Sequence, residues 1–188
     1  MRIVGGTRRG LRLAEVGRGD EAARLRPTAD RVREAIFNLL QNNPARPDPV
    51  PGARVLDLFA GTGALGLEAL SRGAARVAFV EDGAPARALI RRNIELMQAQ
   101  GVTDLWRRDA TALGPCRGAP WTLVFLDPPY GRGLGERALA SARAGGWLAP
   151  DATVVWEEGA PMEPPPGFAL LDRRRYGDTW VTLLAAPG

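Results

Sequence analysis

Short apolar runs alternate along most of the chain with longer segments in which apolar residues recur at helical spacing. The runs that predict strands are 53–60, 75–81, 104–110, 121–127 and 152–158, and the segments that predict helices are 63–73, 84–100 and 134–144. Strands that alternate with helices form a parallel sheet with helices on both faces. Two last runs, 168–176 and 180–185, flank Gly177-Asp178 and predict a hairpin. We therefore expect an α/β fold with a mostly parallel, seven-stranded sheet and an antiparallel C-terminal hairpin.

The beginning of the chain follows a different pattern. RIVGG and GLRLAEV predict a small β-hairpin that turns at Gly5-Gly6. A helix is expected from Thr28 as its N-cap, with Asp30 in the first turn, where negative charge is favourable. Apolar residues mark one face of this helix, and Arg31 and Arg33 are expected off that face.

A Pro-rich stretch separates this extension from the rest. Residues 42–52, NNPARPDPVPG, predict a linker. We therefore divide the chain into an N-terminal hairpin-and-helix extension, residues 1–52, and a main domain, residues 53–188.

The composition narrows the possible chemistry. With 188 residues, 45% of them hydrophobic, the chain can bury a core of its own. No apolar run is long enough for a membrane span or a signal peptide. The chain has one cysteine, no histidine and no lysine, since all 25 basic residues are arginine. These absences exclude His-dependent triads, His- or Cys-rich metal sites, a P-loop lysine and Schiff-base chemistry. A cytoplasmic protein without a metal is expected.

Positive charge is concentrated at the beginning of the chain. Residues 1–52 carry 10 arginines against 6 acidic residues, whereas residues 53–188 carry 15 of each. Localised positive charge favours a polyanionic partner, most simply nucleic acid. A solvated basic surface would give the same count, so charge alone leaves the partner open.

The stretch LDLFAGTGALG, residues 56–66, places glycines between a strand and a helix. Gly61, Gly63 and Gly66 match the G-x-G-x-x-G spacing of dinucleotide-binding loops, in which the backbone approaches a ligand at a helix N-terminus. A tight strand-to-helix turn can have the same spacing. The motif alone therefore leaves both interpretations open.

Four acidic residues favour ligand binding. Asp57, Glu81, Asp109 and Asp127 are expected at the carboxyl ends of four successive strands. Open α/β sheets bind ligands at this edge, and an acid after the second strand faces the ribose hydroxyls of a bound nucleotide. NAD and S-adenosylmethionine both fit these four residues.

The stretch LDPPY, residues 126–130, distinguishes the two cofactors. Pro128 and Pro129 have no backbone N–H, so the strand ladder ends there. The Asp127 carboxylate and a proline carbonyl can then accept the two hydrogens of an exocyclic amine, and Tyr130 can stack on the base that carries it. Such a geometry directs the amine lone pair at an electrophilic methyl group, which favours S-adenosylmethionine.

At LDLFAGTG and LDPPY the sequence resembles the Rossmann-like, class I S-adenosylmethionine-dependent amino-methyltransferases. With LRPTADRVREAIFNLL and MRIVGGTRRGLRL, it is similar to the RsmD family, which methylates the guanine N2 amine of small-subunit (16S) ribosomal RNA. The resemblance extends from Arg2 to about Leu184. It implies a class I methyltransferase fold and S-adenosyl-L-methionine as cofactor. Nothing in the sequence suggests an obligate interface, so a monomer is expected. The implied partner is small-subunit ribosomal RNA, with or without bound ribosomal proteins.

The resemblance also implies roles for individual residues. Those expected to act on the guanine amine are Asp127, Pro128, Pro129 and Tyr130. Those expected to bind the cofactor are Asp57, Phe59, Ala60, Gly61, Thr62, Gly63, Glu81, Asp82, Asp109, Ala110 and Asp127. Those expected to bind RNA are Arg2, Arg8, Arg9, Arg12, Arg26, Thr28 and Arg31.

Other functions stay open at this point. A methyltransferase for DNA adenine or protein glutamine would share LDPPY, but the arginine-rich beginning favours RNA. A non-catalytic RNA-binding protein would not need the intact residues 127–130. A nicotinamide-dependent oxidoreductase is disfavoured because the chain has no lysine and no substrate domain. The run Arg173-Arg174-Arg175 is interpreted as solvated surface.

Overall fold

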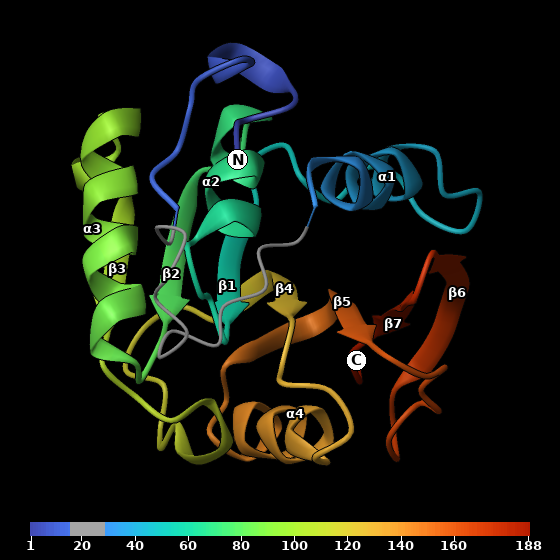
Figure 1. Cartoon of the computed structure of the whole chain (residues 1–188). Coiled ribbons are helices and arrows are strands. Elements are labelled where there is room, and N and C mark those ends of the chain that lie inside the picture. Colours follow the sequence, from blue (N-terminus) through green and yellow to red (C-terminus); the bar gives the residue numbers. More distant parts are fainter. Residues whose placement is uncertain (16–28) are drawn as a thin grey trace.

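The computed structural model describes residues 1–15 and 29–188. In this part of the chain, seven strands form one sheet in the order β3-β2-β1-β4-β5-β7-β6 (Figure 1). Their bounds are β1 (Arg54–Leu58), β2 (Arg76–Val80), β3 (Thr103–Trp106), β4 (Trp121–Leu126), β5 (Leu148–Glu158), β6 (Ala169–Tyr176) and β7 (Thr179–Ala185). Strands β1 to β5 are parallel, and β7 is antiparallel to both β5 and β6. The predicted sheet with its C-terminal hairpin is confirmed.

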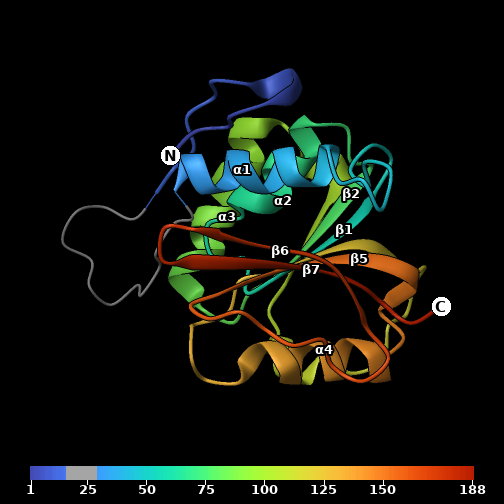
Figure 2. The ribbon, with the colours of Figure 1, turned by 90° about the vertical axis from the view of Figure 1, so that its right-hand side faces the viewer.

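Helices cover both faces of the sheet. The α-helices are α1 (Asp30–Gln41), α2 (Ala64–Ser71), α3 (Ala84–Met97) and α4 (Leu134–Ala144), and the short 3-10 helices are η1 (Gly6–Arg8), η2 (Gln100–Val102) and η3 (Ala110–Ala112). Figure 2 shows α1, α2 and α3 on one face and α4 on the other. None of the helices in the described residues combines the length and apolarity that a membrane span requires.

Alternation along the strands divides the interior into two hydrophobic cores. On β4, Leu123 and Phe125 belong to the core under α1, α2 and α3, while Val124 and Leu126 belong to the core over α4. The Phe37 ring of α1 lies 5.6 Å from the Phe125 ring, centroid to centroid. Helix α1 of the extension therefore shares a hydrophobic core with the sheet. The division at residue 52, into an RNA-binding extension and a cofactor-binding domain, stays a prediction.

The N-terminal segment, residues 1–15, folds back on itself as the predicted hairpin. Arg2 and Arg12 form an antiparallel bridge, and the N–H groups of Ile3 and Leu13 donate to the carbonyls of Leu11 and Met1, at 2.9 and 3.2 Å. The chain reverses through η1 rather than in a tight turn at Gly5-Gly6. Where this reversal begins, the N–H groups of Val4 and Gly5 donate to the Glu68 carboxylate on α2, at 2.8 and 2.7 Å.

Helix α1 also differs from its prediction at its first turn. The residue at the N-cap position is Ala29, which makes no side-chain capping hydrogen bond, and Thr28 lies outside the described residues. Arg33 is fully buried instead of lying off the packed face. Its guanidinium pairs with Asp30 at 2.8 Å and with the buried Glu68 at 3.5 Å, so charge partners replace water around it.

Candidate active site

The strand order changes direction between β1 and β4, which is where open α/β sheets bind ligands. Asp57 is the fourth residue of β1, and Asp127 directly follows β4. The register places Asp57 beside Phe125. Because side chains alternate along a strand, Asp57 and Asp127 both face α1, α2 and α3. The structure therefore brings two of the predicted acids together at the edge where a ligand is expected.

The loop from Phe59 to Gly63, which we call the glycine loop, connects β1 to α2. Phe59, Gly61 and Gly63 have φ angles of 58°, 57° and 77°. This left-handed conformation costs a residue other than glycine about 1–3 kcal/mol, and it is concentrated at functional sites. Hydrogen bonds hold the loop: the Gly63 N–H donates to the Ala60 carbonyl at 2.7 Å, and the Ala60 N–H donates to a carbonyl of β2 at 3.1 Å.

Gly66, the third glycine of the motif, allows close packing of α2 on the sheet. A Cβ at this position would lie 2.5 Å from the Phe79 ring and 2.7 Å from Val77. The Gly66 N–H also donates to Asp57 Oδ2 at 3.0 Å. Gly66 thus positions the start of α2, and Asp57 fastens it to β1.

Asp57 is only 2% exposed, and its environment disfavours its charge. Burial raises its pKa well above the usual value, the Gly66 hydrogen bond opposes this, and repulsion from Asp127 and Glu81 raises the pKa further. These three carboxyl groups are therefore close enough to interact. A cationic group bound among them would relieve their repulsion, whereas an anionic group would increase it.

Glu81 directly follows β2 and connects the glycine loop to the start of α3. Its two carboxylate oxygens accept from the N–H of Gly61 at 2.9 Å and from the N–H of Gly83 at 2.8 Å. Burial raises the pKa of Glu81, and these two hydrogen bonds oppose that effect. Each oxygen keeps a further lone pair for a ligand hydroxyl. The neighbouring Asp82 is exposed.

Strand β3 ends earlier than the sequence predicted, so Asp109 is not at the strand end itself. Strand β3 ends at Trp106, so Asp109 follows it by three residues and serves as the N-cap of η3. Its Oδ1 accepts from both the Oγ1 and the N–H of Thr111, at 2.7 and 2.8 Å, and these bonds lower the pKa of Asp109. Oδ2 is left for a ligand, and the next residue, Ala110, is buried.

The stretch from Asp127 to Gly131, which we call the amine loop, has a buried side and an exposed side. Pro128 is buried and Asp127 half-buried, whereas Pro129 is exposed and Tyr130 is 40% exposed. The Tyr130 hydroxyl lies 3.3 Å from Thr179 Oγ1, at the start of β7. Burial of part of the ring raises the pKa of Tyr130 to about 12. The hydroxyl therefore stays protonated at neutral pH, and the exposed ring is left as a surface for stacking.

Glu158 holds the end of the amine loop, and sequence reasoning missed it. Its Oε1 accepts from the N–H of Gly131 at 3.0 Å and from the N–H of Gly159 at 2.8 Å. A Cβ at Gly159 would lie 3.2 Å from the Tyr130 ring, so the ring packs directly on this glycine. Glu158 is the last residue of β5. An acid at a strand end was therefore visible here too, as it was for the four residues that were predicted.

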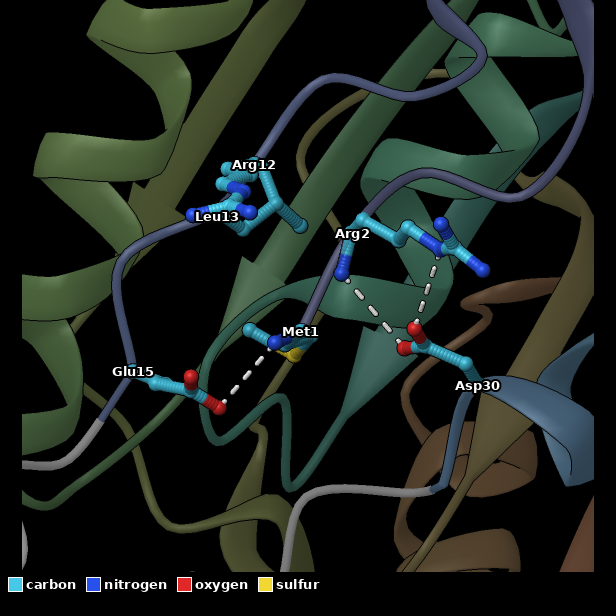
Figure 3. Close-up of a pocket in the computed structure, with 6 residues that line it drawn as sticks. All are labelled: Met1, Arg2, Arg12, Leu13, Glu15 and Asp30. Carbon is cyan, nitrogen blue, oxygen red and sulfur yellow. Dashed lines mark hydrogen bonds and ion pairs between the residues drawn. The ribbon is translucent and has the colours of Figure 1, made fainter.

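The arginines predicted to bind RNA are exposed wherever the structure describes them, and Arg26 lies outside the described residues with Thr28. Arg2 and Arg12 line a pocket of about 290 Å³ (Figure 3). Its other lining residues are Met1, Leu13, Glu15 and Asp30. Met1 Sδ lies 3.5 Å from Thr62 Oγ1, so this pocket adjoins the glycine loop.

The other three arginines lie apart from this pocket or at its margin. The Arg8 N–H donates to Ser71 Oγ at 2.9 Å, which places Arg8 and Arg9 at the far end of α2. Arg31 is exposed on the first turn of α1, next to the pocket residue Asp30. The structure therefore places Arg2 and Arg12 at the pocket that adjoins the glycine loop and Arg31 next to the pocket residue Asp30, but it places Arg8 and Arg9 at the other end of α2.

This fold is that of the class I methyltransferases: a seven-stranded mixed sheet whose seventh strand lies antiparallel between the fifth and the sixth. The solved structure of the Escherichia coli protein yhhF has a TM-score of 0.83 to this chain at 34% identity, and the match covers 100% of this chain and 98% of that one. The expectation of a class I methyltransferase fold is confirmed. For residues 1–15 and 29–188, no group of three or more His, Cys, Asp or Glu residues is placed to hold a metal ion.

Sequence relatives identify the family within this class. Ribosomal RNA small subunit methyltransferase D of Escherichia coli (strain K12) is 40% identical over 158 residues, which are 84% of this chain and 74% of the relative. The Haemophilus influenzae protein of the same name is 31% identical over 182 residues, 94% of this chain and 89% of the relative. The family model described as Conserved hypothetical protein 95 matches residues 1–185. The chain belongs to this family, which is the RsmD family.

Proposed function

We propose that this chain is an S-adenosylmethionine-dependent methyltransferase that modifies the exocyclic N2 amine of a guanine in small-subunit ribosomal RNA. The observation that carries the proposal is the position of the amine loop beside Asp57 and the glycine loop, at the point where the strand order reverses. The names of the Escherichia coli and Haemophilus influenzae relatives support ribosomal RNA as the substrate.

The cluster of carboxyl groups fits S-adenosylmethionine better than NAD. S-adenosylmethionine carries positive sulfonium and ammonium groups, which would relieve the repulsion among Asp57, Glu81 and Asp127. The two phosphates of NAD would increase that repulsion. In this proposal Asp57 lies near the ammonium, Glu81 accepts from the ribose hydroxyls, and Asp109 Oδ2 accepts from the adenine amine.

The amine loop supplies the groups that the reaction needs on the substrate side. The cofactor, when bound, supplies an electrophilic methyl group. The Asp127 carboxylate and the Pro128 carbonyl accept the two N–H bonds of the guanine amine, and the exposed Tyr130 ring packs on the base. Orientation then aims the nitrogen lone pair along the line of attack. Asp127 and Pro128 would hold the nitrogen while it takes the methyl group, S-adenosylhomocysteine would leave, and water would accept the proton that the nitrogen loses.

The basic N-terminal segment provides the contact with RNA. Arg2 and Arg12 are exposed at the pocket that adjoins the glycine loop, and Arg31 is exposed next to the pocket residue Asp30; guanidinium groups there can bind phosphate. Because the N2 amine cannot reach the amine loop from within a helix stack, the guanine must be unstacked when it binds. In this proposal the enzyme acts in the cytoplasm, where ribosomal RNA is found, and it acts as a monomer.

Transfer of labelled methyl groups tests the proposal. Purified protein with labelled S-adenosylmethionine is incubated with unmethylated small-subunit RNA, assembled small subunits, DNA and a glutamine-containing protein. Label is expected in the RNA or the subunits, and not in the other two. The Asp127→Ala variant is expected to keep cofactor binding and lose transfer. Label found mainly in DNA or protein would contradict the RNA substrate.

A further inference from the structure

Asn93 on α3 joins two segments that are distant in sequence. Its side chain is fully buried. Asn93 Oδ1 accepts from the N–H of Ala14 at 2.7 Å, and Nδ2 donates to the carbonyls of Ala14 at 3.1 Å and Thr62 at 2.9 Å. One amide thus pairs with the N-terminal segment as a neighbouring strand would. The same amide holds the glycine loop.

Both N–H donors of the Asn93 amide are used, and so is its oxygen. A buried amide with all these partners has one orientation, since any rotation would leave buried polar groups without hydrogen bonds. The position of Ala14 is therefore fixed relative to Thr62. Ala14 is the second residue after Arg12, and Thr62 lies in the glycine loop.

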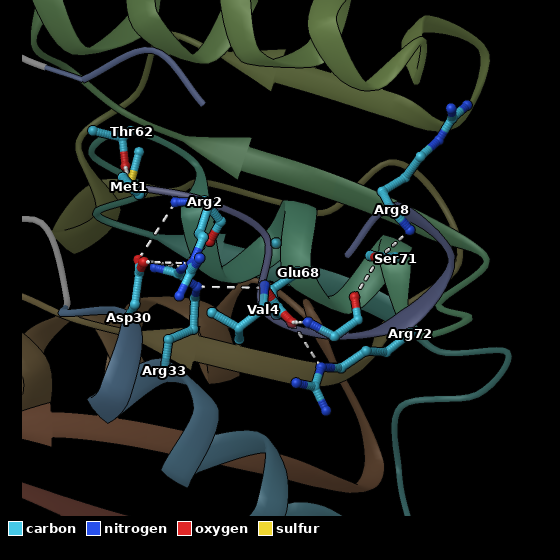
Figure 4. A network of polar contacts seen from close by, with 12 residues as sticks. Met1, Arg2, Val4, Arg8, Asp30, Arg33, Thr62, Glu68, Ser71 and Arg72 are labelled. Atoms are coloured by element: carbon cyan, nitrogen blue, oxygen red, sulfur yellow. Dashed lines mark hydrogen bonds and ion pairs between the residues drawn. The ribbon is translucent and has the colours of Figure 1, made fainter. Parts of the chain in front are cut away.

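Two further contacts attach the N-terminal segment to the glycine loop and to α2 (Figure 4). Met1 Sδ lies 3.5 Å from Thr62 Oγ1. On α2, which follows the glycine loop, the Glu68 carboxylate accepts from the N–H groups of Val4 and Gly5 and pairs with Arg72 at 2.8 Å. The segment that carries the arginines is thus attached to the glycine loop itself and to the helix that the loop begins.

We propose that Asn93 is a positioning residue that couples binding of the cofactor to binding of RNA. This inference rests on the proposed function. A cofactor that fixes the glycine loop also fixes the Thr62 carbonyl, and through Asn93 it fixes the segment that presents Arg12 to RNA. Linkage makes the effect reciprocal, so RNA raises the affinity for the cofactor by the same factor.

The coupling is measured as the ratio of two dissociation constants. The Kd for unmethylated small-subunit RNA, free or in assembled subunits, is determined without and with saturating S-adenosylhomocysteine, which binds without transferring a methyl group. For the unmodified protein we expect the RNA Kd to fall by about 5-fold or more, the lower end of typical allosteric coupling. In Asn93→Leu, which removes all three hydrogen bonds, the two Kd values are expected to be equal.

Asn43→Leu is the matched control. Asn43 is also a buried asparagine, but it follows the C-terminal end of α1, and its Oδ1 accepts from the N–H of Ala45, at 2.9 Å. This variant is expected to keep the full ratio of Kd values even if it loses stability. If Asn93→Leu does not fold, Asn93→Ala replaces it, because alanine also removes all three hydrogen bonds and is too small to clash with the buried surroundings.

The outcomes separate this inference from the proposed function. Equal Kd values in the unmodified protein, or an unchanged ratio in the Asn93 variant, would overturn the coupling while leaving an RNA methyltransferase intact. Failure of the unmodified protein to bind S-adenosylhomocysteine at all would contradict the proposed function, and this inference with it. Loss of the ratio in Asn93→Leu but not in Asn43→Leu would support it.

Discussion

Glu158 tests whether the shape of the amine loop matters for catalysis. Its single oxygen Oε1 accepts from two backbone N–H groups, those of Gly131 and Gly159. Hydrogen bonds to a charged group contribute about 1.5–3 kcal/mol each, so about 3–6 kcal/mol is an upper bound for the pair. Both glycines are exposed, and water can replace part of this energy. We therefore expect Glu158→Ala to lower the free energy of unfolding by about 2 kcal/mol.

The effect on the reaction should be larger than the effect on binding. A displacement of about 1 Å in a positioned group can reduce a rate by about 100-fold, so kcat of Glu158→Ala is expected to fall by about that factor. The Kd for S-adenosylhomocysteine should not change, because Glu158 contacts neither the glycine loop nor Glu81. Methyl transfer to small subunits gives kcat, and calorimetry gives the Kd.

Glu158→Gln is the matched variant, because its amide oxygen can still accept from both N–H groups. Its kcat is expected to stay within a few-fold of that of the unmodified protein. A folded Glu158→Ala variant with unchanged kcat would refute the role of Glu158. An equal loss of kcat in Glu158→Gln and Glu158→Ala would show that the charge of Glu158, and not its hydrogen bonds to the loop, supports catalysis.

Substitutions at four further positions test the buried and exposed charges and the aromatic ring. Arg33→Met should cost about 3–5 kcal/mol in denaturant unfolding because it breaks a buried ion pair, whereas the exposed Arg31→Met should keep stability but weaken RNA binding and reduce its salt slope by about 1. The raised pKa of Asp57 means that the folded state binds its proton more tightly, so stability is lost as pH rises through that pKa. Urea unfolding between acid and neutral pH should show a smaller loss in Asp57→Asn, in which the raised pKa of Glu81 still contributes. Tyr130→Phe should keep most of kcat and Tyr130→Ala should lose it, because stacking uses the ring; equal loss in both would implicate the hydroxyl.

The fold was predictable because its signals are local. Gly73, expected to end α2, has φ +103°, a conformation that favours glycine. The hairpin around Gly177-Asp178 and the alternation of strands with helices were equally visible in short windows of sequence. The end of β3 was misplaced because the two arginines before Asp109 do not show where the ladder stops.

The structure differs from the prediction where a contact with a residue distant in sequence outweighs the local sequence pattern. Arg33 sits on a helix at a position that would ordinarily face water, and only Glu68, 35 residues away, makes its burial possible. The same carboxylate accepts from the N–H groups of Val4 and Gly5, where the hairpin reverses through η1 instead of a tight turn. The pattern of apolar and polar residues near the N-terminus does not indicate a partner on another helix.

The site was predictable as far as it depends on the sheet. Asp57, Glu81 and Asp127 meet because parallel strands end at one edge, and a pattern of acids after apolar runs is enough to find them. Asn93 could not be found in this way, because its importance lies in hydrogen bonds to the backbones of Ala14 and Thr62. A single asparagine within a helix carries no signal of such a role.

Analysis of the methylated nucleoside tests the central claim most directly. Unmethylated small subunits are incubated with the protein and S-adenosylmethionine, and their RNA is digested to nucleosides and examined by mass spectrometry against standards. The account predicts N2-methylguanosine at one position, and none with Asp127→Ala. A methyl group on another atom or another base, or equal product with Asp127→Ala, would contradict it.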